Sequence, residues 1–468
     1  MTTVPQARGV PVPQARGVPV PQARGVQAGA RTRGAAPASS QIALLARPLA
    51  SYYLIVGATL LLVGLGLVMV FSASSITQYA KFGSSSRLFA KQLMWVAIGL
   101  PAMWVASRLP VRFFRALAYP LLVASIALLV LVPVIGFGKD GGIRWLAVGP
   151  LTVQPSELSK LALALWGADL FARKSKSLND WRHVFVPLLP VTSVLVVLIM
   201  MGNDMGTTLV VVSILIALLW VVGLPGRQFG MFFAGTVGLC TVVAVSEPYR
   251  LARLLSYLNP GADPLGKGLQ AVQGRIGIAQ GGWFGLGLGN SRQKWGILPN
   301  SQTDFIFAII GEELGLLGTL IVVALFALLG YVGLRIAQRS TDPFSRYAAV
   351  AVTVWLLTQA IINMGAVVGL VPITGIPLPL VSFGGTSLVP TLFALGMLAS
   401  FARREPGAAE ALAARGAGPL RQSLRWAARY YGFGPAPSGQ ARQRTRRGRS
   451  HQGRNHQGRS HRRVAGQQ

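Results

Sequence analysis

The sequence predicts an all-α integral membrane protein with about ten transmembrane helices, and three observations support this prediction. Of the 468 residues, 52% are hydrophobic and only 12% are charged. Long apolar runs follow one another through the middle of the chain. Lysine and arginine gather in the two ends of the chain and in alternate loops between these runs. Soluble globular proteins do not combine these features, so a helical bundle in a bilayer is the expected fold.

The apolar runs define the candidate spans. About 20 apolar residues cross a hydrocarbon core of about 30 Å. Ten runs approach this length, at residues 53–72, 89–107, 114–135, 156–172, 184–201, 206–223, 228–246, 305–333, 346–371 and 387–403. A loop of about 58 residues separates the seventh run from the eighth. The first run is long enough to span and follows a Pro- and Arg-rich arm, so no cleavable signal peptide is expected.

The distribution of basic residues predicts how the helices are oriented. Cytoplasmic loops of membrane proteins carry an excess of Lys and Arg. One set of alternate short loops contains Arg108, Arg112, Arg115, Arg173, Lys174, Lys176, Arg182, Arg227, Arg335, Arg339 and Arg346. The other set contains only Lys81, Arg87, Lys139 and Arg144. The first set and both termini are therefore expected on the cytoplasmic side, and the long loop between the seventh and eighth helices on the extracytoplasmic side.

Composition divides the chain into three parts. Residues 1–48 form a Pro- and Arg-rich arm in which Val-Pro-Gln-Ala-Arg-Gly-Val occurs three times. Residues 49–404 form the ten-helix membrane domain, and residues 405–468 form a basic tail rich in Arg and Gly. Charged segments with few large apolar residues cannot bury enough surface to fold, so both tails are expected to be disordered and cytoplasmic.

The formal net charge of +31 favours membrane lipids as partners over nucleic acid. The excess positive charge lies in the tails and short loops. Each basic residue near an anionic membrane surface contributes about 1 kcal/mol of binding free energy. Cys240 is the only cysteine, which excludes a disulfide within the chain and a multi-cysteine metal site. His451, His456 and His461 lie in the C-terminal tail. Two interpretations of this segment stay open: metal binding, or a basic tail in solvent.

Charged side chains at membrane depth are candidates for function, because each costs at least about 2.5 to 3.5 kcal/mol on insertion scales. Arg144 precedes the fourth run, and Glu157 and Lys160 lie within it. Glu157 and Lys160 are three residues apart, hence on one helical face and able to pair. Two interpretations stay open: a structural ion pair that satisfies two buried charges, or an anion site in which Arg144 and Lys160 receive a pyrophosphate.

Other acidic residues lie at or near predicted helix starts. Asp304 stands on the extracytoplasmic side at the start of the eighth span, where a cavity-facing carboxylate could take a proton. The alternative for Asp304 is an N-cap or first-turn anion that complements the helix dipole. Asp204 follows Asn203 in a tight turn and is expected to shape that turn or cap the sixth span. Glu312 and Glu313 lie inside the eighth span, where at least one needs a partner or water.

Two segments rich in glycine or proline cannot form regular helices. Residues 281–289 read GGWFGLGLG, and residues 372–387 read PITGIPLPLVSFGGTS. For the first, close backbone packing in a re-entrant loop is favoured over phosphate binding, because no strand precedes the glycines. The second is tolerated at this depth only where protein or a water-filled cavity buries it. It is expected to line the same outward-facing cavity as Asp304.

These stretches resemble the SEDS (shape, elongation, division and sporulation) family, over about residues 50–403 and in neither tail. The resemblance lies in residues 144–160, in the block Gln302-Thr303-Asp304-Phe305-Ile306-Phe307 and in residues 372–387, in this order. Residues 69–75 and 309–315 are more similar to the division branch of the family than to the elongation branch. The sporulation branch stays open.

The resemblance implies an inverting glycosyltransferase that polymerises lipid II into peptidoglycan at the outer face of the bacterial cytoplasmic membrane. Asp304 corresponds to the family's essential loop aspartate and would act as general base. Substrate contacts are implied at Arg144, Lys160, Glu157, Gln302, Thr303, Ser382 and Gly385. No cofactor is implied with certainty, and a divalent cation stays open. The implied partners are a class B penicillin-binding protein transpeptidase and other divisome proteins at the septum.

Two functions of other classes stay open. A lipid II flippase should place its substrate site and broken helices near the membrane midplane, whereas the residues singled out here gather towards one face. A non-catalytic division scaffold would use the basic tails as docking arms. Such a scaffold would lose activity on deletion of the tails but not on substitution of Asp304.

Overall fold

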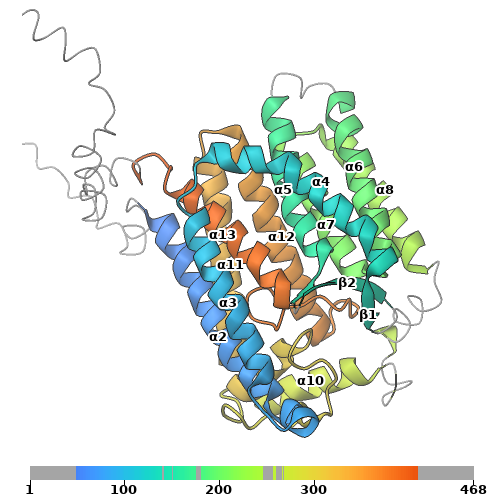
Figure 1. Cartoon of the computed structure of the whole chain (residues 1–468), viewed down its shortest axis with the longest axis vertical. Coiled ribbons are helices and arrows are strands. Elements are labelled where there is room, and N and C mark those ends of the chain that lie inside the picture. Colours follow the sequence, from blue (N-terminus) through green and yellow to red (C-terminus); the bar gives the residue numbers. More distant parts are fainter. Residues whose placement is uncertain are drawn as a thin grey trace, which may run out of the picture. The chain divides into compact units, whose positions relative to one another are not determined.

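The computed structural model describes residues 49–139, 142–149, 151–174, 181–245, 257–259, 266 and 268–408. The arm of residues 1–48 and residues 409–468 of the tail lie outside the described residues. The helices are α2 (Ala50–Phe82), α3 (Arg87–Ala106), α4 (Val111–Ile135), α5 (Pro155–Arg173), α6 (Trp181–Met201), α7 (Met205–Val221), α8 (Gly226–Val245), α10 (Leu269–Gly281), α11 (Ile306–Arg339), α12 (Pro343–Val368) and α13 (Leu388–Ala402). Figure 1 shows α2, α3, α11 and α13 as one group and α4 to α8 as another, with α12 between them.

Each of the ten predicted spans coincides with one of these helices, and α10 lies in the long loop. Among the described helices, six are long and apolar enough to cross a membrane, at Ala50–Ala80, Arg87–Ala106, Val111–Ile135, Ile306–Arg339, Pro343–Val368 and Gly385–Ala402. Shorter apolar stretches occupy Phe185–Met201 and Met205–Val221. The prediction of a multi-pass helical membrane protein is confirmed, and the exact number of ten crossings stays a prediction.

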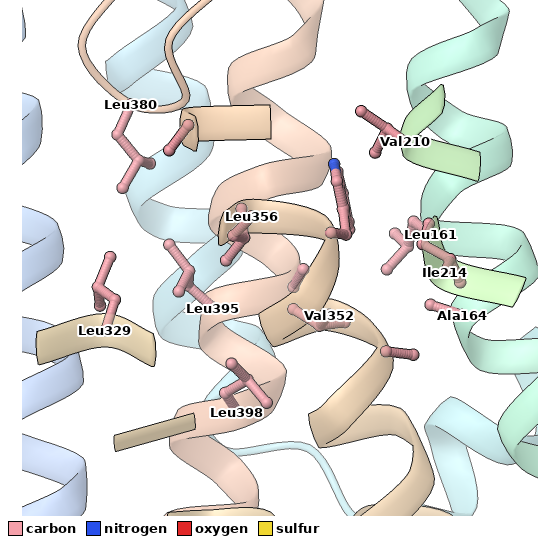
Figure 2. Packing of buried hydrophobic residues seen from close by; sticks show 14 of the residues in the cluster. Leu161, Ala164, Val210, Ile214, Leu329, Val352, Leu356, Leu380, Leu395 and Leu398 are labelled. Carbon is pink, nitrogen blue, oxygen red and sulfur yellow. The ribbon is translucent and has the colours of Figure 1, made fainter. Parts of the chain in front are cut away.

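Helix α5 can carry several charges because other helices surround it. Sixteen of its 19 residues are buried, and it packs against α4, α7 and α12. In Figure 2, Leu161 and Ala164 of α5 lie beside Val210 and Ile214 of α7, opposite Val352 of α12. Protein therefore replaces lipid around α5, and polar side chains can be paired within the bundle.

A small antiparallel sheet precedes α5, which the prediction of helices alone missed. Its strands are β1 (Phe137–Lys139), β2 (Gly142–Val148) and β3 (Leu151–Val153), in the order β1-β2-β3. Phe137 pairs with Trp145, and Val148 pairs with Leu151. Two of the strands have three residues each, too few for alternation along the chain to reveal them. In Figure 1 the sheet lies towards the same lower end of the helices as α10.

Capping residues fix where two helices begin. The Asp204 carboxylate accepts a hydrogen bond from the backbone N–H of Thr207 at 3.0 Å at the start of α7. This confirms the capping role expected of Asp204. Asp342 caps α12 in the same way, accepting from the N–H of Ser345 at 3.0 Å, and Pro343 follows at the first helical position. Side-chain acceptors and proline at these positions satisfy or remove donors that a helix cannot pair.

Candidate functional site

Asp304 lies in a turn of residues 301–305, immediately before α11, and its side chain is half-buried. The N-cap residue of α11 is Phe305, so Asp304 stands one residue outside the helix and does not cap it. The backbone carbonyl of Asp304 accepts a hydrogen bond from Nδ2 of Asn363 at 2.8 Å. Asp304 is therefore held through its main chain by a side chain of α12.

The irregular segment of residues 372–387 packs against the Asp304 turn. Gly375 has a φ of 75°, and a Cβ at that position would lie 3.7 Å from Oδ2 of Asp304. Glycine tolerates this backbone conformation and lets the main chain pass beside the carboxylate. Asn363 donates from Nδ2 to the carbonyl of Ile376 at 2.7 Å as well as to Asp304. One amide thus joins the two segments that the sequence places in the same region.

Ser382 makes the second link between these segments. Its Oγ donates to the carbonyl of Thr303 at 2.6 Å and accepts from the N–H of Leu378 at 2.8 Å. The N–H of Phe383 donates to the carbonyl of Gln302 at 3.0 Å. These bonds satisfy backbone groups that irregular structure at membrane depth would otherwise leave unpaired. The structure therefore brings together Gln302, Thr303, Asp304 and Ser382, while a shared cavity stays a prediction.

The end of the segment reaches the sheet and α3. Gly385 has a φ of 51°, and a Cβ there would lie 3.8 Å from the indole nitrogen of Trp95. Thr386 accepts a hydrogen bond through Oγ1 from the N–H of Gln154 at 3.2 Å. Gln92 donates from Nε2 to the carbonyl of Ser382 at 3.4 Å. Residues before α5 and on α3 thus enclose Gly385.

Glu157 and Lys160 form an ion pair inside the bundle. Lys160 Nζ lies 2.7 Å from Glu157 Oε2, and both side chains are almost completely buried. Lys160 Nζ also donates to Oε1 of Gln359 at 2.9 Å and lies 5.2 Å from the centre of the Trp355 ring. The structural pairing is therefore present, and anion binding by Lys160 stays a prediction.

Gln359 links Lys160 to the irregular segment. Its Oε1 accepts from Lys160 and from the indole N–H of Trp355 at 3.0 Å, so its Nε2 faces the other way. Nε2 donates to the carbonyl of Pro377 at 3.1 Å. Gln359 and Asn363 are four residues apart, on one face of α12. Neither residue is among the predicted site residues, although two amides four residues apart in an apolar helix indicate a polar contact between helices.

Arg144 on β2 links the sheet to the turn between α6 and α7. Its Nε donates to the carbonyl of Gly202 at 3.1 Å, and a terminal nitrogen donates to the carbonyl of Asn203 at 2.5 Å. A guanidinium carries five N–H donors, and these two bonds use two of them. The side chain is half-buried. Arg144 and Lys160 make separate sets of contacts, so the structure does not join them directly.

Asp204 connects the same turn to the start of α5. Its Oδ2 accepts from Oγ1 of Thr207 at 2.8 Å and from Nε2 of Gln154 at 3.1 Å. At Gly206 a Cβ would overlap the side chain of Ile376. The sheet, the start of α7 and the irregular segment therefore form one packed layer at the Asp304 end of the bundle.

Glu312 and Glu313 both have partners, as the sequence requires. Glu312 accepts from the hydroxyl of Ser291 at 2.5 Å and from the N–H of Arg292 at 2.8 Å. Glu313 accepts from the hydroxyl of Ser72 at 2.6 Å, and its Oε1 lies 3.4 Å from Lys294 Nζ. These contacts tie α2 and the long loop to α11, the helix that follows Asp304. Sequence analysis did not identify these partners, which are distant along the chain.

No group of three His, Cys, Asp or Glu side chains suited to a metal ion occurs among the residues that the structure describes. The histidines of the C-terminal tail lie outside those residues. The divalent cation left open by the sequence therefore has no site assigned here.

Residues 52–406 match the FtsW/RodA/SpoVE family of cell cycle proteins. The chain is 44% identical over 407 residues to a probable peptidoglycan glycosyltransferase FtsW of Mycobacterium tuberculosis, covering 82% of this chain and 78% of that relative. It is 40% identical over 354 residues to stage V sporulation protein E of Bacillus subtilis, covering 75% of this chain and 96% of the relative.

Solved structures give the same result. A chain from a peptidoglycan synthase complex that coordinates polymerization and crosslinking matches with a TM-score of 0.61 and 30% identity, over 75% of this chain and 97% of that one. Rod shape determining protein RodA of Thermus thermophilus matches with a TM-score of 0.55 and 27% identity, over the same shares of the two chains. This chain therefore belongs to the FtsW/RodA/SpoVE family of cell cycle proteins, which is the SEDS family of the resemblance.

Proposed function

We propose that this chain is a peptidoglycan glycosyltransferase that polymerises lipid II, with Asp304 as the general base. The names of its relatives support the reaction class. The observation that carries the assignment is the position of Asp304: half-buried, outside the cap of α11 and fixed through its backbone by Asn363. Because the backbone of Asp304 is already fixed, little further conformational entropy is lost when its carboxylate accepts a proton.

In the proposed step, the 4-hydroxyl of the acceptor sugar attacks the anomeric carbon of the donor. A carbon–oxygen bond forms at that carbon as its bond to undecaprenyl pyrophosphate breaks, and the leaving group takes the electron pair. The hydroxyl proton passes to Asp304, and the anomeric configuration inverts. General-base assistance contributes typically about 10²- to 10⁴-fold, so positioning of the two lipid substrates supplies much of the rest.

The other predicted site residues have different parts in this proposal. Arg144 places a cation beside the α6–α7 turn, where it can attract a pyrophosphate. Gln302, Thr303, Ser382 and Gly385 shape the main chain around Asp304. Glu157 and Lys160 place an ion pair within the bundle. We include contacts between all of these residues and the substrate in the proposal.

The same proposal covers partners and location. Because a related chain forms part of a complex that coordinates polymerization and crosslinking, we expect a class B penicillin-binding protein to act beside this chain. We expect further divisome proteins at the septum and a place in the bacterial cytoplasmic membrane, with both termini cytoplasmic. Elongation and sporulation roles are the alternatives within the family.

A lipid II flippase is the second candidate function. The broken segments that the structure describes favour the polymerase, because Asp304, the sheet and residues 372–387 pack at one end of the helices. A transporter site is expected near the midplane. The Glu157 and Lys160 pair, by contrast, is buried between the helices.

Polymerisation of labelled lipid II by the purified protein, together with its cognate transpeptidase, tests the proposal. Asp304→Asn removes the proton acceptor and keeps the size of the side chain. Asp342→Asn is the matched control, because it makes the same chemical change at a helix cap. Both variants are compared with wild type at equal folded concentration.

Loss of glycan strands in Asp304→Asn, with activity kept in Asp342→Asn, is the expected result. Equal polymerisation by Asp304→Asn and wild type would refute the general-base assignment. Absence of polymerisation by wild type, with transbilayer movement of labelled lipid II, would favour the flippase.

A further inference from the structure

Residues 281–289, here called the glycine loop, combine exposed apolar side chains with a main chain that forms four hydrogen bonds with α11. The segment from Gly281 to Ser291 contains no charged residue. Trp283, Phe284 and Leu288 are 68%, 81% and 57% exposed. Such a concentration of large exposed apolar side chains marks a surface that binds something other than water.

Two glycines of the loop, Gly281 and Gly285, lie against the backbone of α11. A Cβ at Gly281 would overlap the carbonyl oxygen of Gly311, and a Cβ at Gly285 would overlap that of Glu313. Gly285, Gly287 and Gly289 also have φ values of 80°, 93° and 84°. Gly281 and Gly285 let the loop backbone lie directly on α11, and the positive φ values of the later glycines turn the chain so that the larger residues between them stay exposed.

Helix α11 is broken where the loop meets it. Gly315 has a φ of 67° and a ψ of −163°, outside the helical region. The N–H groups of Leu316 and Leu317 donate to the carbonyls of Gly282 and Trp283 at 2.9 and 3.3 Å. The break in α11 therefore pairs with the loop.

The pairing is reciprocal. The N–H groups of Leu286 and Gly287 donate to the carbonyls of Glu312 and Glu313 at 2.9 and 3.1 Å. Non-helical backbone at membrane depth is stable only if its polar groups are satisfied by protein or water. The four bonds between loop and helix meet that condition for these groups, so the loop can enter a bilayer without losing them.

The position of the loop along α11 corresponds to a membrane boundary. Arg335 and Arg339 mark one end of the apolar helix. Counting back about 20 residues from Arg335, the number that crosses a hydrocarbon core of about 30 Å, reaches Leu316. Leu316 and Leu317 are the residues that bond to the loop. Tryptophan is enriched at this level of a bilayer, where its ring is apolar and its N–H is wet.

The apolar surface of the loop also continues the lipid-facing side of α11. Leu317, Leu320 and Ile321 are exposed on a helix that is long and apolar enough to span. The hydrogen bond from Leu317 to Trp283 places the two surfaces next to each other. Glu312 and Glu313 lie on the inner side and are buried. Charge is thus kept away from the exposed face.

We propose that the glycine loop inserts into the lipid interface at the Asp304 end of α11, with Trp283, Phe284 and Leu288 in contact with phospholipid. The exposed ring of Phe284 meets acyl chains near the headgroups, and the backbone stays bonded to α11. The inserted loop anchors the extracytoplasmic side of the chain at the break in α11. The proposal does not depend on the catalytic role of Asp304.

Site-directed fluorescence tests the insertion, because Cys240 is the only cysteine. In a Cys240→Ser background, Phe284→Cys and Leu288→Cys each carry an environment-sensitive NBD label. Arg292→Cys is the control, since Arg292 is exposed and charged just beyond the loop. The full-length protein is placed in vesicles of phosphatidylethanolamine and phosphatidylglycerol. Quenching is measured with a lipid that carries a nitroxide near its headgroup and with aqueous iodide.

Several-fold stronger quenching by the nitroxide lipid at 284 and 288 than at 292, with the reverse order for iodide, is the expected result. Quenching of the 284 and 288 labels by iodide as strong as at 292 would overturn the proposal, because the loop would then lie in water. Shielding of both labels from both quenchers would also overturn it, because protein would then cover the loop. The second label position guards against a folding defect in one variant.

Discussion

Asn363 holds the backbone of Asp304 and that of Ile376 with a single amide nitrogen, at 2.8 and 2.7 Å. These carbonyls belong to segments more than 70 residues apart along the chain. Asn363 is itself buried, so water cannot replace the amide without a rearrangement. The distance between Asp304 and the irregular segment therefore depends on this side chain.

Asn363→Asp should reduce polymerisation about 100-fold, because a small misplacement of a reacting group costs about this much. The substitution keeps the shape of the side chain but removes both N–H donors and turns a carboxylate towards two carbonyls. The turnover number is expected to fall more than the Michaelis constant for lipid II rises. Steady-state polymerisation kinetics measure both.

Asn259→Asp is the control, since Asn259 is an exposed amide outside the glycine loop. Its activity should stay close to that of wild type. Full activity in Asn363→Asp would mean that Asp304 is positioned without Asn363. Loss of folded protein in Asn363→Asp, detected by size-exclusion chromatography, would instead assign Asn363 to stability.

The positions of ten described helices could be predicted because each contains an apolar run of nearly sufficient length, whereas α10 in the long loop contains none and was not predicted. Asp204 could be predicted as a cap because acceptor and helix start are neighbours in the sequence. Hydropathy alone is a poor guide to the charged α5, since burial by α4, α7 and α12 replaces lipid there. Local sequence therefore predicts those elements that are stabilised by residues nearby in the chain or by contact with lipid.

Contacts between distant segments could not be predicted in the same way. The bonds from Asn363 to Asp304 and from Ser382 to Thr303 join residues 59 and 79 positions apart. The break at Gly315 depends on the glycine loop that fills it, and a glycine in an apolar helix does not by itself indicate a break. The pairing of the sheet is local, but its outer strands have only three residues each, and strands this short leave no recognisable pattern in the sequence.

Lys160→Met should destabilise the protein by about 3–5 kcal/mol, because it leaves the Glu157 carboxylate buried without its cation. The double variant Glu157→Gln with Lys160→Met should recover most of that loss, since no uncompensated charge remains. Thermal unfolding in detergent measures the difference. Equal stability of Lys160→Met and wild type would contradict a structural role for the pair.

The double variant also separates the two interpretations of Lys160. If the pair is structural, the double variant should polymerise lipid II nearly as well as wild type once it is folded. If Lys160 binds an anionic group of the substrate, the double variant should be stable but require more lipid II for the same rate.

Gly285→Ala should lower the unfolding temperature more than Gly289→Ala. The two glycines have similar φ values, 80° and 84°, so the backbone strain of about 1–2 kcal/mol is common to both. At Gly285 the new methyl group would also overlap the Glu313 carbonyl, whereas nothing lies within 4 Å at Gly289. The difference between the variants measures the contact of the loop with α11. Equal shifts would show that the loop moves aside without cost.

If the Arg144 guanidinium binds a pyrophosphate, Arg144→Lys should raise the Michaelis constant for lipid II and change the unfolding temperature little. Arginine presents a planar fork of donors, whereas lysine offers a compact charge on a more flexible stem. The bonds to the Gly202 and Asn203 carbonyls would be partly lost in the variant. We expect the Michaelis constant for lipid II to rise about tenfold, the loss of about 1.4 kcal/mol that one charge-assisted bond represents. Arg292→Lys, an exposed arginine, should leave it unchanged. A lower unfolding temperature with an unchanged Michaelis constant would limit Arg144 to holding the turn between α6 and α7 against the sheet.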